Sequence, residues 1–287
     1  MSQGPSTVIV ATLLGHAQVD LGLACLGSLL AHSADPLHFR LHDDGSLTAA
    51  DRERLAGALG GPTFVLRPEA DERAAEILAG RPALAAYRRE SPLCSKLVDA
   101  VLFAEGGELA YCDSDVLFLR PFSGLFRFPS PAASACFMRD TQHAYSVRSW
   151  HLLREPRLRF PGRVNTGIIH ARTRCFDPDL LEWFLSRSEY RFAPPWVEQT
   201  CWALLAGKGA CWLHDPRQIA FPRAGRLDPE TVALHFVSPL RGRFTEFRHP
   251  PDRRSEPPVP IRSAPASPCG PLNLAATEIR RRLRRVF

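Results

Sequence analysis

Residues 110–122 read AYCDSDVLFLRPF, and in this stretch Asp113 and Asp115 interrupt a run of apolar residues. The apolar run predicts a buried strand. Two carboxylates within such a strand are costly unless a cation meets them. Their apolar surroundings exclude the role of a helix cap, so we expect a turn or bend at the pair. We therefore expect a cation that binds both side chains.

The Asp-x-Asp spacing alone is weak evidence for a site. With 15 Asp among 287 residues, about one such pair is expected by chance. A second pair, DPD at residues 177–179, opens a predicted helix, where Asp is favoured as an N-cap and by the helix dipole. We expect this second pair to cap its helix and nothing more.

Two interpretations of Asp113 and Asp115 stay open at this point. A hard cation such as Mg²⁺ or Mn²⁺ commonly binds one or two carboxylates together with the phosphates of a substrate. In the alternative, both side chains accept hydrogen bonds from backbone and arginine groups in a turn.

Strands alternate with helices along most of the chain. The predicted strands are residues 7–14, 37–46, 62–68, 110–122, 132–140, 164–172 and 231–238, and the predicted helices are residues 19–33, 46–61, 91–107, 177–187 and 195–209. Thr48 and Ser91 are the expected N-caps of two of these helices. This alternation predicts an α/β domain with a mostly parallel sheet, in which ligands sit at the carboxyl ends of the strands.

The charge of the chain is unevenly distributed. The formal net charge is +6, and residues 241–287 contribute +7, because they hold 11 Arg and 4 acidic residues. The remainder is close to neutral, so the body of the protein gives no support for a nucleic-acid surface. The eight cysteines include no C-x-x-C pair and predict small buried side chains in a reducing compartment. The N-terminal residues lack the pattern of a signal peptide, so we expect a cytoplasmic protein.

Five weak motifs follow one another in a fixed order. They are Lys96 on a predicted helix, Asp113 and Asp115 after a tyrosine, Asn165-Thr166-Gly167 in a strand, Glu198-Gln199 at the start of a helix, and His235 with Arg241 six residues later. This order resembles the retaining glycosyltransferases of family 8, which have the GT-A fold and include glycogenin and bacterial lipopolysaccharide galactosyltransferases. The resemblance covers about residues 7–245.

The resemblance implies a mixed, mostly parallel sheet flanked by helices and a divalent cation, Mn²⁺ or Mg²⁺, held by Asp113, Asp115 and His235. That cation would bind the diphosphate of a nucleotide sugar, most simply UDP-glucose or UDP-galactose. The resemblance also assigns Glu198 and Gln199 to the catalytic centre. The expected donor contacts are Lys96, Asn165, Thr166, Gly167, Arg241 and Asp43. For Asp43, turn formation by Asp-Asp-Gly explains the residue equally well.

The mechanism stays open from the sequence. Glutamine is a poor nucleophile, so a front-face reaction is the more economical account of retention at Gln199. An inverting transferase with Glu198 as general base is an alternative, and so is a nucleotide-sugar-binding protein without catalysis. The sequence also departs from the family pattern. Ser238 replaces a glycine, residues 241–243 replace Lys-Pro-Trp, and an expected aspartate is absent from ACFM at residues 135–138, although Asp140 lies further on in the same predicted strand.

Three segments are expected along the chain. Residues 1–248 form the glycosyltransferase domain, residues 249–272 form an extended or disordered Pro- and Arg-rich linker, and residues 273–287 form a basic amphipathic segment. This last segment is typical of a peripheral membrane anchor, and a solvated tail is the alternative. A carbohydrate, lipid-linked or protein acceptor is expected, and nothing in the sequence specifies it.

Overall fold

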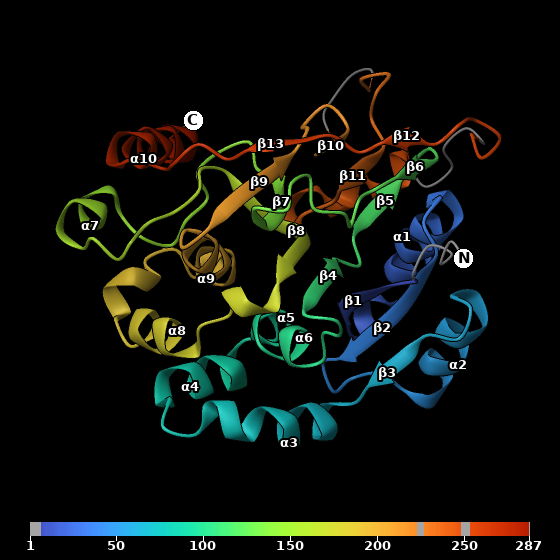
Figure 1. Cartoon of the computed structure of the whole chain (residues 1–287), viewed down its shortest axis with the longest axis horizontal. Helices are drawn as coiled ribbons and strands as arrows, with labels where there is room; N and C mark the ends of the chain where they lie inside the picture. The colour runs from blue at the N-terminus through green and yellow to red at the C-terminus, as the bar shows by residue number, and fades with distance from the viewer. Residues whose placement is uncertain (1–6, 223–226, 248–252, 287) are drawn as a thin grey trace.

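The computed structural model describes residues 7–222, 227–247 and 253–286. An eight-stranded sheet in the order β13-β9-β7-β8-β4-β1-β2-β3 runs through the molecule (Figure 1). Its strands are β1 (Val8–Leu14), β2 (Leu37–Asp43), β3 (Thr63–Val65), β4 (Glu108–Cys112), β7 (Ala133–Arg139), β8 (Val164–Arg172), β9 (Ala210–His214) and β13 (Ser263–Pro265).

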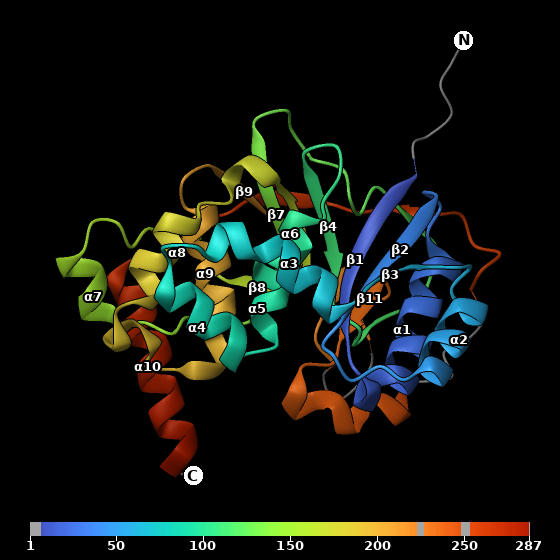
Figure 2. The same cartoon turned by 90° about the horizontal axis from the view of Figure 1, so that it is seen from below.

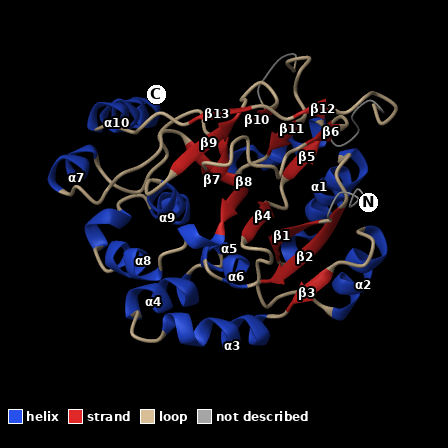
Figure 3. Cartoon of the chain, viewed as in Figure 1, coloured by secondary structure: helices blue, strands red, loops and turns tan. Residues whose placement is uncertain are grey.

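The sheet is mixed, as expected. The pairings β1–β2, β1–β4, β2–β3 and β7–β9 are parallel, and the pairings β4–β8, β7–β8 and β9–β13 are antiparallel. The predicted α/β class with a mostly parallel sheet flanked by helices is therefore confirmed (Figure 3).

Successive residues of the central strands point to opposite faces of the sheet and enter two different cores. In β4, Leu109 and Tyr111 pack on one face, and Ala110 and Cys112 pack on the other. The first core is covered by α3 (Arg67–Leu78), α4 (Pro82–Glu90), α5 (Leu93–Leu97), α6 (Asp99–Leu102), α8 (Pro178–Leu185) and α9 (Val197–Ala206). The second core is covered by α1 (Val19–His32) and α2 (Ala49–Ala58).

The stretch at residues 110–122 is divided by the expected turn. It contains the end of β4, then β5 (Val116–Phe118) and the start of β6 (Phe122–Ser123), and residues 113–115 lie between β4 and β5. β5 leaves the large sheet and pairs antiparallel with β11 (Ala233–His235), which pairs in turn with β10 (Ile219–Ala220). The two aspartates therefore stand at the junction of two sheets.

The two capping predictions for Asp and Thr are confirmed. Asp177 is the N-cap of α8 and accepts the N–H of Leu180 at 2.9 Å. Thr48 caps α2 in a capping box with Asp51. At α5 the prediction is one residue off, because Pro92 and not Ser91 is the N-cap.

Other boundaries differ from the sequence prediction. The helix expected at residues 91–107 is two short helices, α5 and α6, separated at Val98, whose φ of −104° and ψ of −61° break the regular helical path. Lys96 and Asp99, on either side of this break, are buried and bind different partners, Asp113 and Arg88. The helices α3 and α4 were not predicted.

The C-terminal part of the described chain continues the fold. Residues 259–265 include β12 (Val259–Pro260), which pairs with β6, and β13, which extends the large sheet along β9. The helix α10 (Pro271–Val286) then lies beside α7 (Ser149–Arg154) at one end of the molecule (Figure 2). Within the described ranges, no helix combines the length and apolar composition that a membrane span requires.

Candidate metal and donor-binding site

The turn between β4 and β5 is fixed by backbone hydrogen bonds to both sheets. The N–H of Asp113 donates to the carbonyl of Gly167 on β8 at 2.8 Å, and the carbonyl of Asp115 accepts the N–H of Phe236 after β11 at 2.9 Å. Because His235 pairs with Val116 across β11 and β5, its side chain is delivered to the same turn.

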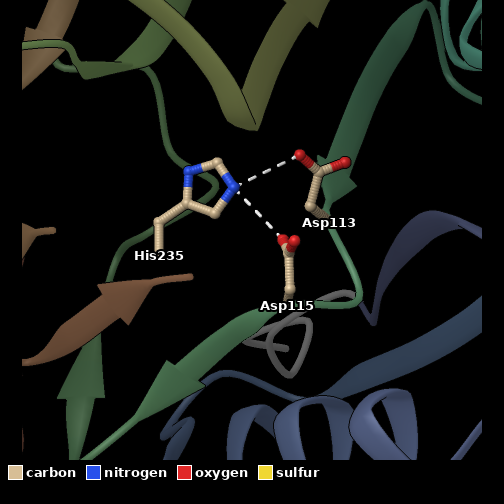
Figure 4. A group of neighbouring side chains, drawn as sticks. All are labelled: Asp113, Asp115 and His235. Atoms are coloured by element: carbon tan, nitrogen blue, oxygen red, sulfur yellow. Dashed lines mark ion pairs between the residues drawn. The ribbon is translucent and has the colours of Figure 1, made fainter. Parts of the chain in front are cut away.

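Asp113, Asp115 and His235 point toward one another in this turn (Figure 4). His235 Nε2 lies 3.1 Å from Asp115 Oδ1 and 3.6 Å from Asp113 Oδ2. One ligand atom from each of the three residues lies within 4.8 Å of the others. The spacing allows the three side chains to share one cation.

The chemistry of the three side chains fits a divalent cation. Asp115 Oδ1 is buried and has no hydrogen-bond partner among the described residues, despite its closeness to His235. An isolated carboxylate oxygen in the interior is costly, and a cation would satisfy it. Two carboxylates and an imidazole, with open positions for further oxygen ligands, suit Mn²⁺ or Mg²⁺ bound together with a diphosphate.

Asn165 orients the histidine for this role. Its Oδ1 lies 3.0 Å from His235 Nδ1 and also accepts the N–H of Gly167 at 3.0 Å. An amide oxygen only accepts hydrogen bonds, so Nδ1 carries a proton, and Nε2 is the ring nitrogen that would bind a cation. The amide of Asn165 is held in turn by Asp140 Oδ2 and Gln199 Oε1, each 3.3 Å from its Nδ2.

Gly167 is required by close packing. A Cβ atom built on Gly167 would lie 2.4 Å from ring atoms of His235, which is closer than any real contact. The glycine expected to contact the donor therefore lies directly against the candidate metal ligand.

Two basic side chains reach the aspartates. Lys96 is buried, and its Nζ donates to both carboxylate oxygens of Asp113 at 3.0 Å. Arg241 donates to Asp115 Oδ2 from Nε at 3.0 Å and from Nη2 at 2.8 Å. Its side chain stays 43% exposed. Both basic residues predicted from the motif order are thus brought to the Asp pair.

The electrostatics follow from these contacts. Burial raises the pKa of Asp115, but the nearby His235 and Arg241 outweigh it and hold that pKa below its usual range. Burial lowers the pKa of Lys96, yet the charges of Asp113 and Glu198 outweigh it and keep the pKa of the amine raised. In the folded protein both groups are charged at neutral pH.

Glu198 and Gln199 open α9 on the far side of Lys96. Glu198 Oε2 accepts a hydrogen bond from Thr166 Oγ1 at 2.9 Å, and Lys96 Nζ lies 3.9 Å from Oε1. Oε1 is buried and has no hydrogen-bond partner among the described residues. Burial raises the pKa of Glu198 to about 7; the charge of Lys96 opposes this shift and that of Asp113 adds to it. Gln199 Nε2 donates to the carbonyl of Ala144 at 2.8 Å.

Asp43 is the one predicted site residue that forms no hydrogen bond or ion pair with these side chains in the described part of the chain. It ends β2, and its Oδ1 accepts the N–H groups of Gly45 at 2.8 Å and Leu47 at 3.1 Å. Turn formation, the alternative offered by the sequence, is what its contacts show.

Two residues at the site were absent from the predicted set. Tyr111 donates its hydroxyl to Asp113 Oδ1 at 3.1 Å, and Asp140 accepts from the amide of Asn165. Burial raises the pKa of Asp140, and its hydrogen bonds only partly oppose that shift. The signals were available: Tyr111 stands in the lead-in to the Asp pair, and Asp140 follows the strand that lacks the expected aspartate.

Comparisons with known proteins place this geometry in a structural class. No protein-family model matches the chain, and no curated protein matches its sequence. Solved structures do match. Mouse xyloside xylosyltransferase 1 is 11% identical, with a TM-score of 0.58 over 82% of this chain and 99% of that chain. The galactosyltransferase LgtC, solved with donor and acceptor sugar analogues, is 18% identical, with a TM-score of 0.55 over 84% of this chain and 95% of that chain.

The bifunctional glycosyltransferase WbbM is 12% identical, with a TM-score of 0.51, and the match spans 82% of this chain and 46% of that one. At these identities the likeness shows the fold. The chain has the GT-A fold of these glycosyltransferases, as the resemblance in the motif order implied. The roles of individual site residues stay predictions.

Proposed function

We propose that the chain is a metal-dependent glycosyltransferase that moves a hexose from a nucleotide sugar, UDP-glucose or UDP-galactose, to a carbohydrate or glycolipid acceptor. One observation carries this proposal. In a GT-A fold, Asp113, Asp115 and His235 converge at a turn in which Asp115 Oδ1 is buried and accepts no hydrogen bond from the described part of the chain. Relatives of this fold are named for xylosyl and galactosyl transfer, so the choice of sugar rests with residues outside this cluster.

Asp113, Asp115 and His235 would hold Mn²⁺ or Mg²⁺, which when bound neutralises charge on the nucleoside diphosphate that leaves. Lys96 and Arg241 supply further positive charge. Each still has donors free, since Lys96 has a third N–H and Arg241 keeps Nη1. They can therefore bind phosphate oxygens of the donor while they stay beside the aspartates.

Glu198 is placed to bind the sugar. Its Oε1 lacks a hydrogen bond, and a hydroxyl of the donor hexose would satisfy it. Thr166 and Lys96 fix the carboxylate from either side. Because Thr166 occupies Oε2, Oε1 is the oxygen left for a substrate, and we assign it to binding of the sugar. An inverting transferase with Glu198 as general base is the alternative.

Gln199 is held by a donated and an accepted hydrogen bond, with Ala144 and Asn165. An amide fixed in this way is a poor nucleophile, which supports a front-face reaction with retention. The anomeric configuration of the first-formed product, followed by proton NMR, tests this point. An inverted product would instead favour Glu198 as base.

Measurement of UDP release from a panel of UDP-sugars, with Mn²⁺ and with a chelator, tests the activity. The Asp115→Asn variant removes one charge from the cluster, and we expect it to lose at least about a hundredfold in rate. Asp179→Asn is the matched control, because it makes the same change in the chance Asp-x-Asp pair, where Asp179 binds only Arg81 in the described chain.

Release that survives both chelation and Asp115→Asn would refute the metal-dependent proposal. Tight UDP binding with no release from any donor, against a broad set of acceptors, would favour the nucleotide-sugar-binding protein.

The C-terminal helix α10 suggests that the protein contacts a membrane surface. The helix α10 lies beside α7 (Figure 2). On α10 the side chains of Ile279 and Leu283 are 58% and 55% exposed, and on α7 Leu153 is exposed as well. Apolar side chains among arginines are typical of a helix that binds an anionic membrane surface. We propose a cytoplasmic protein that contacts the inner face of a membrane through this segment.

Flotation with anionic vesicles tests the membrane contact in the full chain. Ile279→Asp/Leu283→Asp should reduce flotation by at least about tenfold, since each buried apolar side chain contributes about 1.5–3 kcal/mol. Leu66→Asp changes an exposed leucine at the start of α3 and is the control. Equal flotation of both variants would refute the anchor.

A further inference from the structure

A cavity of about 470 Å³ lies at the edge of the large sheet that is remote from β2 and β3. It opens between β7, β9 and β13, which are neighbours in Figure 1, and the start of α10. Its charged and titratable lining residues include Arg139 at the end of β7, Arg163 just before β8, His143, Arg262 and Asp215, whose carboxylate is bound by Arg262. This volume suits a sugar-sized ligand.

The arginines that line this cavity differ in whether they form an ion pair. Arg262 binds the carboxylates of Asp215 and Glu230. In contrast, no hydrogen bond or ion pair of the Arg139 or Arg163 side chain is found within the described ranges. In another cavity, of about 560 Å³, the lining arginines Arg40 and Arg127 are each paired with a carboxylate. The 470 Å³ cavity is thus lined by two arginines that form no ion pair within the described ranges and can bind an anion.

Arg163 also has an unusual backbone. Its φ of 61° is the only positive value found for a non-glycine residue in the described chain. This left-handed conformation is costly for a residue with a Cβ, and a glycine would adopt it freely. Such strain gathers at functional sites. The carbonyl of Arg163 accepts the N–H of Asp140 at 2.7 Å. This strained residue is therefore hydrogen-bonded to a residue of the candidate metal and donor-binding site.

His143 completes the polar wall. Its Nδ1 is buried without a hydrogen-bond partner among the described residues, and its ring packs on Gly162, where an added Cβ would lie 2.9 Å from the ring. Burial and the charge of Arg163 lower the pKa of His143, so the ring is neutral at pH 7. A neutral imidazole can donate one hydrogen bond to a ligand and accept another.

The position relative to the Asp-Asp-His cluster suggests which substrate uses this cavity. In the register of β7 and β8, Arg139 pairs with Val164 and Met138 pairs with Asn165. The cavity therefore borders the side of the Asp-Asp-His cluster on which Asp140 and Asn165 lie. Asp43 and the end of β2 lie on the other side of β4, where a nucleotide would bind at the carboxyl ends of parallel strands. The cavity therefore lies on the acceptor side.

We propose that this cavity binds an anionic group, a phosphate or a carboxylate, carried by the acceptor saccharide. Arg139 and Arg163 would each form charge-assisted hydrogen bonds with the anion, and His143 would orient it. The binding of an anion stands on the cavity itself, whereas its assignment to the acceptor rests on the proposed glycosyltransferase function.

Titration of the protein with inorganic phosphate, glucuronate and neutral glucose, followed by calorimetry, tests the anion site. We expect phosphate or glucuronate to bind, and R139Q/R163Q to weaken that binding at least about tenfold. The R89Q/R174Q variant removes the same charge from two exposed arginines outside the cavity and should leave the affinity unchanged. Equal anion affinity in the two double variants, or no saturable binding to the wild type, would overturn the proposal.

A second experiment tests the link to the acceptor. Pairs of acceptors that differ only in a phosphate or in a carboxylate are compared for transfer, with donor hydrolysis measured in parallel. R139Q/R163Q should lower kcat/KM at least about tenfold for the charged acceptors and leave neutral acceptors and donor hydrolysis unchanged. Whichever acceptor shows the loss identifies phosphate or carboxylate as the bound group.

The two proposals fail in distinguishable ways. Donor hydrolysis with no preference for charged acceptors would overturn the acceptor role and leave the glycosyltransferase intact. Absent hydrolysis and absent transfer with every donor and acceptor, together with phosphate binding that R139Q/R163Q abolishes, would overturn the glycosyltransferase and support the anion site.

Discussion

The side chain of Asn165 was expected to contact the donor sugar, and its hydrogen bonds indicate a second role, which is to orient His235. Its Oδ1 is shared by His235 Nδ1 and the N–H of Gly167. Only Nδ2 remains for a substrate, and it already faces Asp140 and Gln199. The amide would thus act on a bound cation through the tautomer of the histidine.

Replacement of Asn165 by leucine keeps the volume and removes the acceptor. We expect Mn²⁺ affinity to fall about 10–100-fold, since partners of a ligating histidine contribute about that much. Calorimetry gives the affinity, and long-range proton–nitrogen NMR of His235 in the metal-free protein reports which nitrogen is protonated. Unchanged affinity together with an unchanged tautomer would show that the amide does not orient the ring.

Glu198 makes the stability of the metal-free protein depend on pH. Its pKa is raised from 4.5 to about 7 in the folded state, so the folded protein binds this proton more tightly than the unfolded chain. The resulting stability is fully present below pH 4.5 and is lost as the pH rises through about 7. Linkage gives a loss of about 3 kcal/mol.

Urea unfolding at pH 5 and pH 8, with chelator present, measures this effect. The Glu198→Gln variant cannot titrate at this position and should lack this part of the pH dependence. Parallel pH profiles for the wild type and the variant would contradict the raised pKa.

At the scale of elements, strands were easier to predict than the connections between them. Near-continuous apolar runs indicated the central strands, because both faces of the sheet are covered by helices. The edge strand β13, of three residues in a Pro-rich stretch, has no such pattern and depends on pairing with β9. Its contribution to the sheet was therefore invisible in the sequence.

The candidate site shows the same limit. The Asp pair could be predicted because it breaks an apolar run, and its twin at residues 177–179 proved to be a helix cap. His235 came from the family resemblance, because the β5–β11 pairing that brings it to the turn spans more than a hundred residues. The unpaired Arg139 and Arg163 required the structure, since pairing of charges cannot be read from composition.

The packing of β8 against β11 gives a prediction at this scale. Gly167→Ala would place a methyl group 2.4 Å from the His235 ring. Overpacking should cost about 1–3 kcal/mol of stability and displace the ring from the aspartates. Urea unfolding and Mn²⁺ titration of the same variant check both effects. Gly57→Ala, on α2 with open space around it, is the control and should not lose stability.

At the scale of the whole molecule, the candidate ligands belong to two sheets. Asp113 follows β4 of the large sheet, whereas Asp115 precedes β5 and His235 ends β11 of the small sheet. A cation bound by all three should stabilise the folded protein by about 2.7 kcal/mol at a hundred times its Kd. Thermal unfolding with and without Mn²⁺ measures this gain, and Asp115→Asn should abolish it. An equal gain in that variant would place the cation elsewhere.

A cation at this junction would link the two sheets. Without it, the small sheet β10-β11-β5 meets the turn through the backbone bond from Phe236 to Asp115 and through Arg241, which can exchange with solvent. Amide hydrogens of β10 and β11 should then exchange faster in chelator than those of β1 and β4. Metal depletion would loosen the molecule on one side only, and limited proteolysis would begin there.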